Sequence, residues 1–149
     1  MAEAYDALRL DRQLCFRLYS ASREVTRLYR PYLDPLGLTY PQYLVMLVLW
    51  ESAEPLSVGE LGQRLALESN PLTPMLKKLE TIGYVSRNRC ERDERVLLVS
   101  VTDAGWDLRE RALEVPSCVY RAMGVTDATA VALVETLDAF SAELHERYK

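Results

Sequence analysis

The three cysteines of this 149-residue chain, Cys15, Cys90 and Cys118, are the side chains most able to do chemistry. Their number is odd, they lie far apart and no two form a CxxC pair, so they do not indicate a disulfide framework. With His145 as the one histidine, they give no zinc site, and we expect neither a metal nor another cofactor. A cysteine can instead act as a nucleophile, because its thiolate is reactive.

Cys15 has the most suggestive surroundings, since it lies between Arg12 and Arg17. Apolar residues recur there at alternating steps of four and three, which predicts a helix over residues 11–33 with Asp11 as its N-cap. Near the start of a helix, the dipole and the neighbouring arginines would stabilise a thiolate. Without further information, an inert cysteine in the core is the more common interpretation.

Two short helices are predicted near the middle of the chain. Ser57 and Glu60 form a capping box that opens the first of them. The second is amphipathic and basic on its outer face, ends at Gly83, and has Asn70 and Thr73 as alternative caps, each before a proline. Two short helices joined by a tight polar turn are typical of a helix-turn-helix.

After these helices, the spacing of apolar residues changes from a helical to a β-like pattern. Two β-like runs, at residues 84–89 and 95–101, flank the charged tip CERDE and predict a hairpin, which is the wing of a winged helix. Asp93 lies two residues before Arg95, so the two side chains could pair and orient the guanidinium. A bundle with an incidental hairpin is the alternative.

Helices are also predicted on both sides of the winged region. One has Pro41 at its first position. Another opens after the hairpin at Thr102 or Asp103, and Pro116 marks its kink or break. The last helix lies within residues 124–149.

The charge distribution favours DNA as a partner. The whole chain has a net charge of −4, but residues 71–95 carry six basic and four acidic side chains, net +2, which leaves −6 elsewhere. A recognition helix enters the major groove, and arginines at a wing tip reach the minor groove. The candidate DNA-binding residues are Ser69, Asn70, Thr73, Lys77, Lys78, Arg87, Arg89, Arg92, Asp93 and Arg95. Of these, Lys78, Arg87 and Arg89 are expected at phosphates.

These elements predict a mainly α fold with a small β-hairpin, in one domain covering residues 1–149. The winged helix-turn-helix occupies residues 55–101, flanked by dimerisation helices at 11–35 and 102–149. The first and last helices have long apolar faces, and pairing them between two chains gives a homodimer that matches a palindromic double-stranded operator. A bundle buried within one chain is the alternative.

No feature of the sequence indicates a membrane protein. The longest apolar run, residues 43–50, is too short to span a bilayer. The chain does not open with a basic region followed by an apolar one, as a signal peptide does. We therefore expect a cytoplasmic protein whose cysteines are free thiols.

The order of these elements resembles the MarR family of dimeric winged-helix transcription regulators. The segment DERVLLVSVTDAG (93–105) is similar to that family's wing signature, D-x-R followed by a strand and T-x-x-G. The segments LCFRLYSASREVTRLYRPYLDPLGLTYPQYLVMLVLWE (14–51) and TPMLKKLE (73–80) resemble the organic hydroperoxide resistance regulators (OhrR). The resemblance covers nearly the whole chain.

The resemblance implies a sensor at Cys15. In that branch, organic hydroperoxide oxidises an N-terminal cysteine to a sulfenic acid, and two tyrosines of the partner subunit, here Tyr29 and Tyr40, hydrogen-bond it. Along one helix, Cys15 and Tyr29 are separated by about 21 Å, so they cannot touch within a chain. Antiparallel packing of two such helices could bring them together. Repression, rather than activation, is also implied by the family.

The fate of the sulfenic acid is left open by the resemblance. Some members use an external thiol, and others form an intersubunit disulfide with a second cysteine. Cys118 is the candidate resolving residue, whereas Cys90, at the wing, is expected to be a bystander.

Two alternatives are compatible with the same residues. One is a MarR-type regulator that responds to a non-covalently bound phenolic or other small ligand, with Cys15 incidental. The other is a thiol peroxidase, although a basic wing is unnecessary for such an enzyme and no recycling CxxC motif is present. We expect a regulator, not an enzyme.

Overall fold

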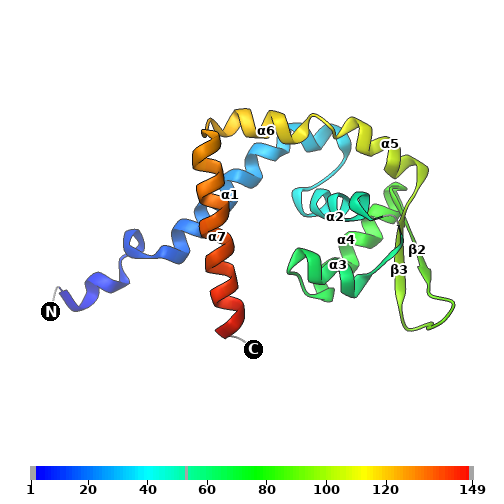
Figure 1. Ribbon diagram of the computed structural model, residues 1–149, viewed down its shortest axis with the longest axis horizontal. Helices are drawn as coiled ribbons and strands as arrows, with labels where there is room; N and C mark the ends of the chain where they lie inside the picture. Colours follow the sequence, from blue (N-terminus) through cyan, green and yellow to red (C-terminus); the bar gives the residue numbers. More distant parts are fainter. Residues whose placement is uncertain (1–2, 53, 148–149) are drawn as a thin grey trace.

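The computed structural model describes residues 3–52 and 54–147, and it confirms a mainly helical fold with a small sheet (Figure 1). In chain order, the elements are the 3-10 helices η1 (Glu3–Leu8) and η2 (Leu10–Arg12), α1 (Leu14–Leu33), the 3-10 helix η3 (Asp34–Leu36), α2 (Tyr40–Glu51), β1 (Leu56–Ser57), α3 (Val58–Leu65), α4 (Ser69–Ile82), β2 (Val85–Arg89), β3 (Leu97–Val101), α5 (Asp103–Arg111), α6 (Val115–Met123) and α7 (Asp127–Arg147).

The sheet contains one more strand than the sequence predicts. β2 and β3 pair in antiparallel register from Val85 opposite Val101, which confirms the hairpin. β1 joins the other edge of β3 with Leu56 opposite Val99, giving the order β1-β3-β2. β1 has two residues, too few to show the alternation of apolar and polar side chains by which strands are recognised.

The hydrophobic core is centred on α2, between α1 and the winged region. Tyr43, Val45 and Met46 are almost fully buried. The apolar run of α2 is therefore explained by burial on several sides. At its C-terminal end, the Trp50 indole Nε1 donates to the carbonyl of Gly105 (3.0 Å), which joins α2 to α5.

Helix caps agree with the predictions at Ser57, which forms a capping box with Glu60, and at Thr102, whose hydroxyl accepts from Gly105 N–H at 3.1 Å. The predicted caps Asn70 and Thr73 are wrong, because α4 begins at Ser69. The N-cap position is Glu68, which makes no side-chain cap hydrogen bond, and the Thr73 hydroxyl donates to Ser69 O inside the helix (3.1 Å).

The predicted N-cap of α1 is also wrong. α1 begins at Leu14, and its N-cap position is Gln13. Asp11 instead forms an ion pair with Arg9 (2.7 Å). The later start places Cys15 in the first turn of α1.

Pro116 marks a break and not only a kink. α5 ends at Arg111, and α6 starts at Val115 with Pro116 in its first turn, where a missing N–H costs no helical hydrogen bond.

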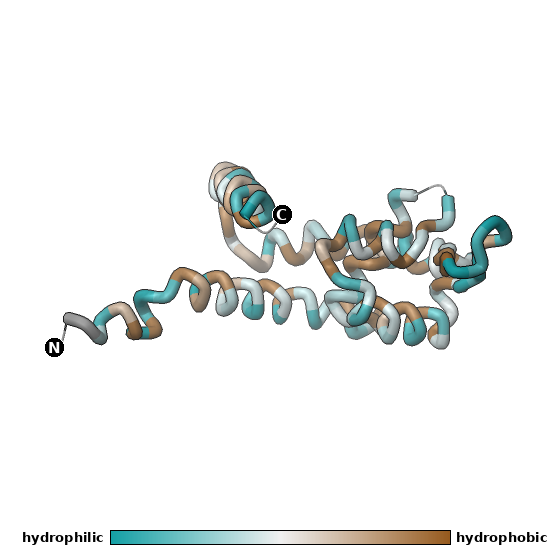
Figure 2. Tube along the Cα trace, turned by 90° about the horizontal axis from the view of Figure 1, so that it is seen from below, coloured by the Kyte–Doolittle hydropathy of each residue, from teal (hydrophilic) through white to brown (hydrophobic). Residues whose placement is uncertain are grey.

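The N-terminal arm, which consists of η1, η2 and the start of α1, and the helix α7 both extend from the body of the molecule (Figure 1). They overlap in Figure 1 but are clearly separate in Figure 2, which also shows hydrophobic stretches along the uncovered N-terminal arm. No residue of α7 is buried. The exposed large apolar residues of these segments are Tyr5, Leu8, Leu10, Leu14, Val131, Leu133, Val134, Leu137 and Leu144. Among the described helices, none is long and apolar enough to cross a membrane.

The T-x-x-G motif has a packing explanation. Thr102 ties the end of the hairpin to the start of α5, since its N–H donates to Tyr84 O (3.1 Å) and its hydroxyl donates to Gly83 O. A Cβ at Gly105 would overlap Tyr84 O and would lie 2.7 Å from Val101 Cγ1. Residue 105 must therefore be glycine for α5 to pack this closely against the hairpin.

We expect Gly105→Ala to lower the free energy of unfolding by about 3 kcal/mol, because backbone as well as side chains must move. Urea denaturation measures the change. Gly59→Ala is the matched control, since the nearest atom to its Cβ is Ser57 Oγ at 3.9 Å. It should be neutral or stabilising by up to about 1 kcal/mol. Equal stability of the Gly105 variant and the wild type would contradict the packing explanation.

Candidate DNA interface and thiol sensor

α4 has one buried and one exposed face. Leu72, Leu76 and Leu79 point into the core. The polar residues predicted to read DNA all lie on the exposed face, and these are Ser69, Asn70, Thr73, Lys77 and Lys78. The first three occupy the first turns of the helix, the part that contacts base edges when a recognition helix enters the major groove. The Thr73 hydroxyl donates to Ser69 O (3.1 Å) and remains able to accept.

The wing tip is held by hydrogen bonds within the tip itself. Asp93 Oδ1 accepts from the backbone N–H of Arg95 (3.0 Å), and Asp93 O accepts from Val96 N–H (2.9 Å). The Asp93 carboxylate thus fixes the turn. The pairing with the Arg95 guanidinium that the sequence suggested is absent among the hydrogen bonds and ion pairs of the described residues. Arg92 and Arg95 are exposed at the tip, as insertion into a minor groove requires.

Two other arginines of the hairpin have partners within the chain. The Arg87 guanidinium is paired with Glu80 of α4, with Nη2 2.7 Å from Oε2. Arg89 Nη1 donates to the carbonyl of Glu94 (2.6 Å), across the base of the tip. The structure therefore gives both residues contacts that the sequence did not predict, in addition to their expected role at phosphates.

Cys15 is exposed and is a free cysteine. The two neighbouring arginines are directed to other groups: Arg12 pairs with Asp6 (3.1 Å), and Arg17 Nη2 donates to Asp11 O (3.2 Å). Cys15 itself lies in the first turn of α1, where backbone N–H groups lack helical partners.

Tyr29 and Tyr40 lie together, although they come from different helices. Their ring centroids are 4.5 Å apart with the planes tilted by 43°, and Tyr43 lies 5.8 Å from Tyr29. Burial raises the pKa of the Tyr29 and Tyr40 phenols, and it raises the pKa of Tyr43 to about 12. All three phenols are therefore protonated near neutral pH and can donate hydrogen bonds.

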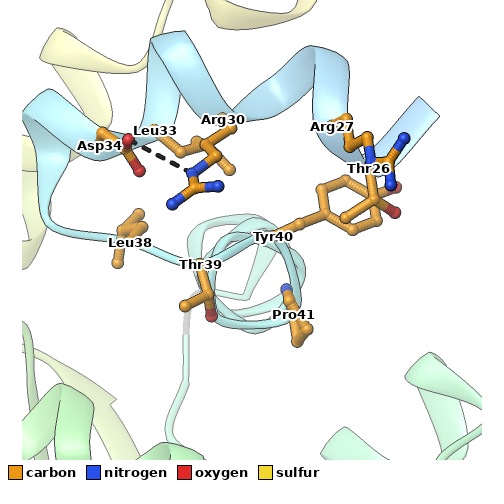
Figure 3. Close-up of a pocket in the computed structure, with 9 residues that line it drawn as sticks. All are labelled: Thr26, Arg27, Arg30, Leu33, Asp34, Leu38, Thr39, Tyr40 and Pro41. Carbon is orange, nitrogen blue, oxygen red and sulfur yellow. Dashed lines mark ion pairs between the residues drawn. The ribbon is translucent and has the colours of Figure 1, made fainter. Parts of the chain in front are cut away.

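A cavity of about 410 Å³ lies beside Tyr40, between α1 and the start of α2 (Figure 3). Arg30 and Asp34 face each other along its α1 side, with Nε 3.7 Å from Oδ2. The lining residues are Thr26, Arg27, Arg30, Leu33, Asp34, Leu38, Thr39, Tyr40 and Pro41. The sequence did not indicate this cavity, because its walls come from two helices and the turn between them.

The remaining cysteines are both half-buried. Cys118 lies on α6, which packs against α1, and its Sγ accepts from Arg121 Nη2 (3.3 Å). Cys90 follows β2, and its backbone N–H donates to Val96 O (2.9 Å). The hairpin that Cys90 belongs to and the start of α1 that carries Cys15 lie at opposite ends of the molecule (Figure 1).

The tyrosine cluster makes stability depend on pH in the alkaline range. A tyrosine in the unfolded chain ionises near its ordinary pKa of 10.0, whereas the pKa of Tyr43 in the folded chain is about 12. Between these values the unfolded chain releases its proton first, so the free energy of unfolding falls as pH rises. Tyr43→Phe should make that fall shallower in denaturation curves measured across this range. An unchanged slope would contradict the assignment.

The comparisons with known proteins agree with this geometry. Residues 27–111 match a family model described as transcriptional regulator SarA/Rot. The chain is 48% identical over 119 residues to the organic hydroperoxide resistance transcriptional regulator of Bacillus subtilis (strain 168), covering 80% of each chain. It is 40% identical over 131 residues to the HTH-type transcriptional regulator SarZ of Staphylococcus epidermidis, covering 88% of each.

Solved structures give the same result. The structure of reduced AbfR bound to DNA superposes with a TM-score of 0.75 at 37% identity, over 95% of this chain and 98% of that one. Wild-type MarR from E. coli, at 24% identity and a TM-score of 0.68 over 86% of this chain and 96% of that one, shares the fold. The chain therefore has the MarR-type winged-helix fold and belongs to the family of the organic hydroperoxide resistance transcriptional regulators.

Proposed function

We propose that this chain is a redox-sensing transcriptional repressor, which binds a palindromic operator as a homodimer when Cys15 is reduced and releases it when organic hydroperoxide oxidises Cys15. The observation that carries this proposal is the Tyr29–Tyr40 pair. Two protonated phenols lie side by side. Cys15, to which they would donate hydrogen bonds, is exposed and lies too far along α1 for Tyr29 of the same chain to contact it.

A second chain completes this sensor. α1 is continuous from Leu14 to Leu33, so Cys15 and Tyr29 lie about 21 Å apart along it. Antiparallel packing of two α1 helices would bring Cys15 of one chain to the tyrosines of the other. The uncovered apolar residues of the N-terminal arm and α7, including Leu14 (61% exposed) and Val134 (58% exposed), support the dimer.

The chemistry at Cys15 is a two-electron oxidation. The thiolate sulfur attacks one peroxide oxygen, the S–O bond forms as the O–O bond breaks, and the alkoxide takes a proton to leave as an alcohol. The sulfur is oxidised to the sulfenic acid, and the peroxide is reduced. Phenol hydrogen bonds from Tyr29 and Tyr40 stabilise the thiolate before attack.

DNA binding uses the exposed face of α4 and the wing tip. Ser69, Asn70 and Thr73 are placed for base edges, and Lys77 and Lys78 for phosphates. Arg92 and Arg95 reach the minor groove beside it. The structure of reduced AbfR bound to DNA supports this assignment, because it has the same fold at 37% identity.

We expect Cys15→Ser to keep its affinity for the operator after treatment with cumene hydroperoxide, whereas the wild type loses it and regains it with a reductant. Cys90→Ser is the control and should behave as the wild type. Fluorescence anisotropy with a labelled operator duplex measures the difference. Release of DNA by the Cys15 variant on peroxide treatment would exclude thiol sensing at this residue.

The sulfenic acid has Cys118 as its proposed resolving partner. The Cys118 thiolate would attack the sulfur of Cys15 in the other chain, forming S–S with loss of hydroxide as water. Cys118→Ser should then abolish the covalent dimer that oxidation produces on a non-reducing gel, and Cys90→Ser should leave it. A covalent dimer of unchanged intensity in the Cys118 variant would exclude Cys118 and leave an external thiol as the resolving agent.

A further inference from the structure

The basic side chains of α4 and the wing divide into two groups within the part of the chain that the structure describes. Lys77, Lys78, Arg92 and Arg95 make no side-chain ion pair or hydrogen bond there, so their charges are available to DNA. Arg87 and Arg89 are different. Arg89 Nη1 donates to the carbonyl of Glu94 within the wing, whereas the Arg87 guanidinium is paired with the carboxylate of Glu80, which lies on another element. The charge of Arg87 is already paired within the chain, so its role calls for an explanation other than attraction to phosphates.

The contact between Glu80 and Arg87 consists of three hydrogen bonds. Glu80 Oε2 accepts from Arg87 Nε (2.9 Å) and Nη2 (2.7 Å), while Oε1 accepts from the Arg87 backbone N–H (3.0 Å). The side chain of Glu80 is 37% exposed and that of Arg87 is 19% exposed. Because both carboxylate oxygens are engaged, one by the guanidinium and one by the backbone N–H, the contact fixes orientation as well as distance. The pairing with Arg87 also keeps the pKa of Glu80 below its usual value, so the contact persists through the neutral range.

The pair connects the two elements that must contact DNA together. Glu80 is in the last turn of α4, and Arg87 is in the middle of β2. The chain between these elements turns at Gly83, which has a φ of 96°. A hairpin with strands of five residues extends roughly 17 Å from that turn, so a tilt of 10° at its base would displace the tip by about 3 Å. Such a displacement equals the length of a hydrogen bond.

We propose that the Glu80–Arg87 pair is a positioning device, which holds the wing at the angle to α4 that lets Arg92 and Arg95 reach the minor groove while α4 occupies the major groove. The inference rests on the proposed DNA binding but not on the proposed redox switch. It assigns Glu80, an acidic residue in the DNA-binding region, a favourable effect on DNA affinity.

The electrostatic alternative makes the opposite prediction. A carboxylate near the phosphates repels them, so Glu80→Gln would tighten binding if charge alone mattered. If Arg87 acted as a phosphate contact, Arg87→Lys would keep the positive charge and most of the affinity. A positioning role predicts that both conservative variants weaken binding. Glutamine cannot accept hydrogen bonds at both positions that Glu80 Oε1 and Oε2 occupy, and lysine cannot donate from two guanidinium nitrogens.

The test uses the full-length reduced protein and a duplex selected by the wild type from a random-sequence pool. We expect Glu80→Gln and Arg87→Lys each to weaken binding about tenfold, with the double variant no weaker than either single one. Glu94→Gln is the matched control, since its carboxylate lies on the wing and makes no ion pair among the described residues. It should bind as tightly as the wild type, or more tightly.

Footprinting separates positioning from general damage. In Glu80→Gln, hydroxyl-radical protection of the flanking minor groove should be lost, while methylation protection of major-groove guanines by α4 is kept. The retained protection, with a thermal midpoint near that of the wild type, shows that the variant is folded.

Affinity equal to or above that of the wild type in Glu80→Gln, with both footprints intact, would overturn the positioning role alone. A wild type that selects no duplex from the pool would overturn the proposed DNA binding and this inference together. Peroxide is absent from every arm, so the redox part of the proposed function stands or fails separately.

Discussion

The continuity of α1 is the constraint on which the proposed sensor depends. From Leu14 to Leu33 the helix has no break, and its one proline, Pro31, lies near its end. A rigid helix keeps Cys15 and Tyr29 about 21 Å apart whatever happens at either end. The structure brings Tyr40 to Tyr29 but leaves Cys15 exposed, so within one chain the donors and the thiol remain apart. In the proposed sensor, only the packing of two chains can complete the site, so it would report on their relative position.

The 3-10 helix η3, which directly follows α1, is held by hydrogen bonds to Tyr84 and to α5. Tyr84 Oη, between α4 and β2, donates to Leu36 O (2.9 Å), and Arg111 Nη2, at the end of α5, donates to Pro35 O (3.0 Å). Trp50 connects α2 to α5 in the same way. In the proposed dimer, a change in the packing of α1 against the partner chain would therefore move α4 and the wing as one body. Because a palindromic operator requires a fixed spacing between two reading heads, such a movement would reduce affinity.

Local signals in the sequence predicted the elements and two of the helix caps, but not the caps at Asp11, Asn70 and Thr73, and they did not predict contacts between distant segments. The capping box at Ser57, the hairpin and the cap at Thr102 depend on residues a few positions apart, and they were confirmed. β1 was missed because its pairing partner lies more than forty residues away. The start of α1 was misplaced because Asp11 has a competing partner in Arg9.

The same distinction applies to the site. The residue types at Cys15, Tyr29 and Tyr40 were recognisable by resemblance, and the helical rise alone showed that the first two cannot meet in one chain. The contact of Tyr29 with Tyr40, the cavity beside it and the Glu80–Arg87 pair were not predictable, because each joins side chains from separate elements. The charge of Arg87 suggested a phosphate contact, and no local pattern indicated that an acidic residue seven positions earlier would bind it.

The central claim is that the tyrosines of one chain serve the cysteine of the other, and mixed dimers test it most directly. In a heterodimer of a Cys15→Ser chain with a Tyr29→Phe/Tyr40→Phe chain, the one remaining Cys15 faces intact tyrosines across the interface. Its sulfenic acid should form at the wild-type rate per site when cumene hydroperoxide is added. In a heterodimer of wild type with a Cys15→Ser/Tyr29→Phe/Tyr40→Phe chain, the remaining Cys15 faces phenylalanines and should react about tenfold more slowly. Fast reaction in the second heterodimer and slow reaction in the first would contradict the account.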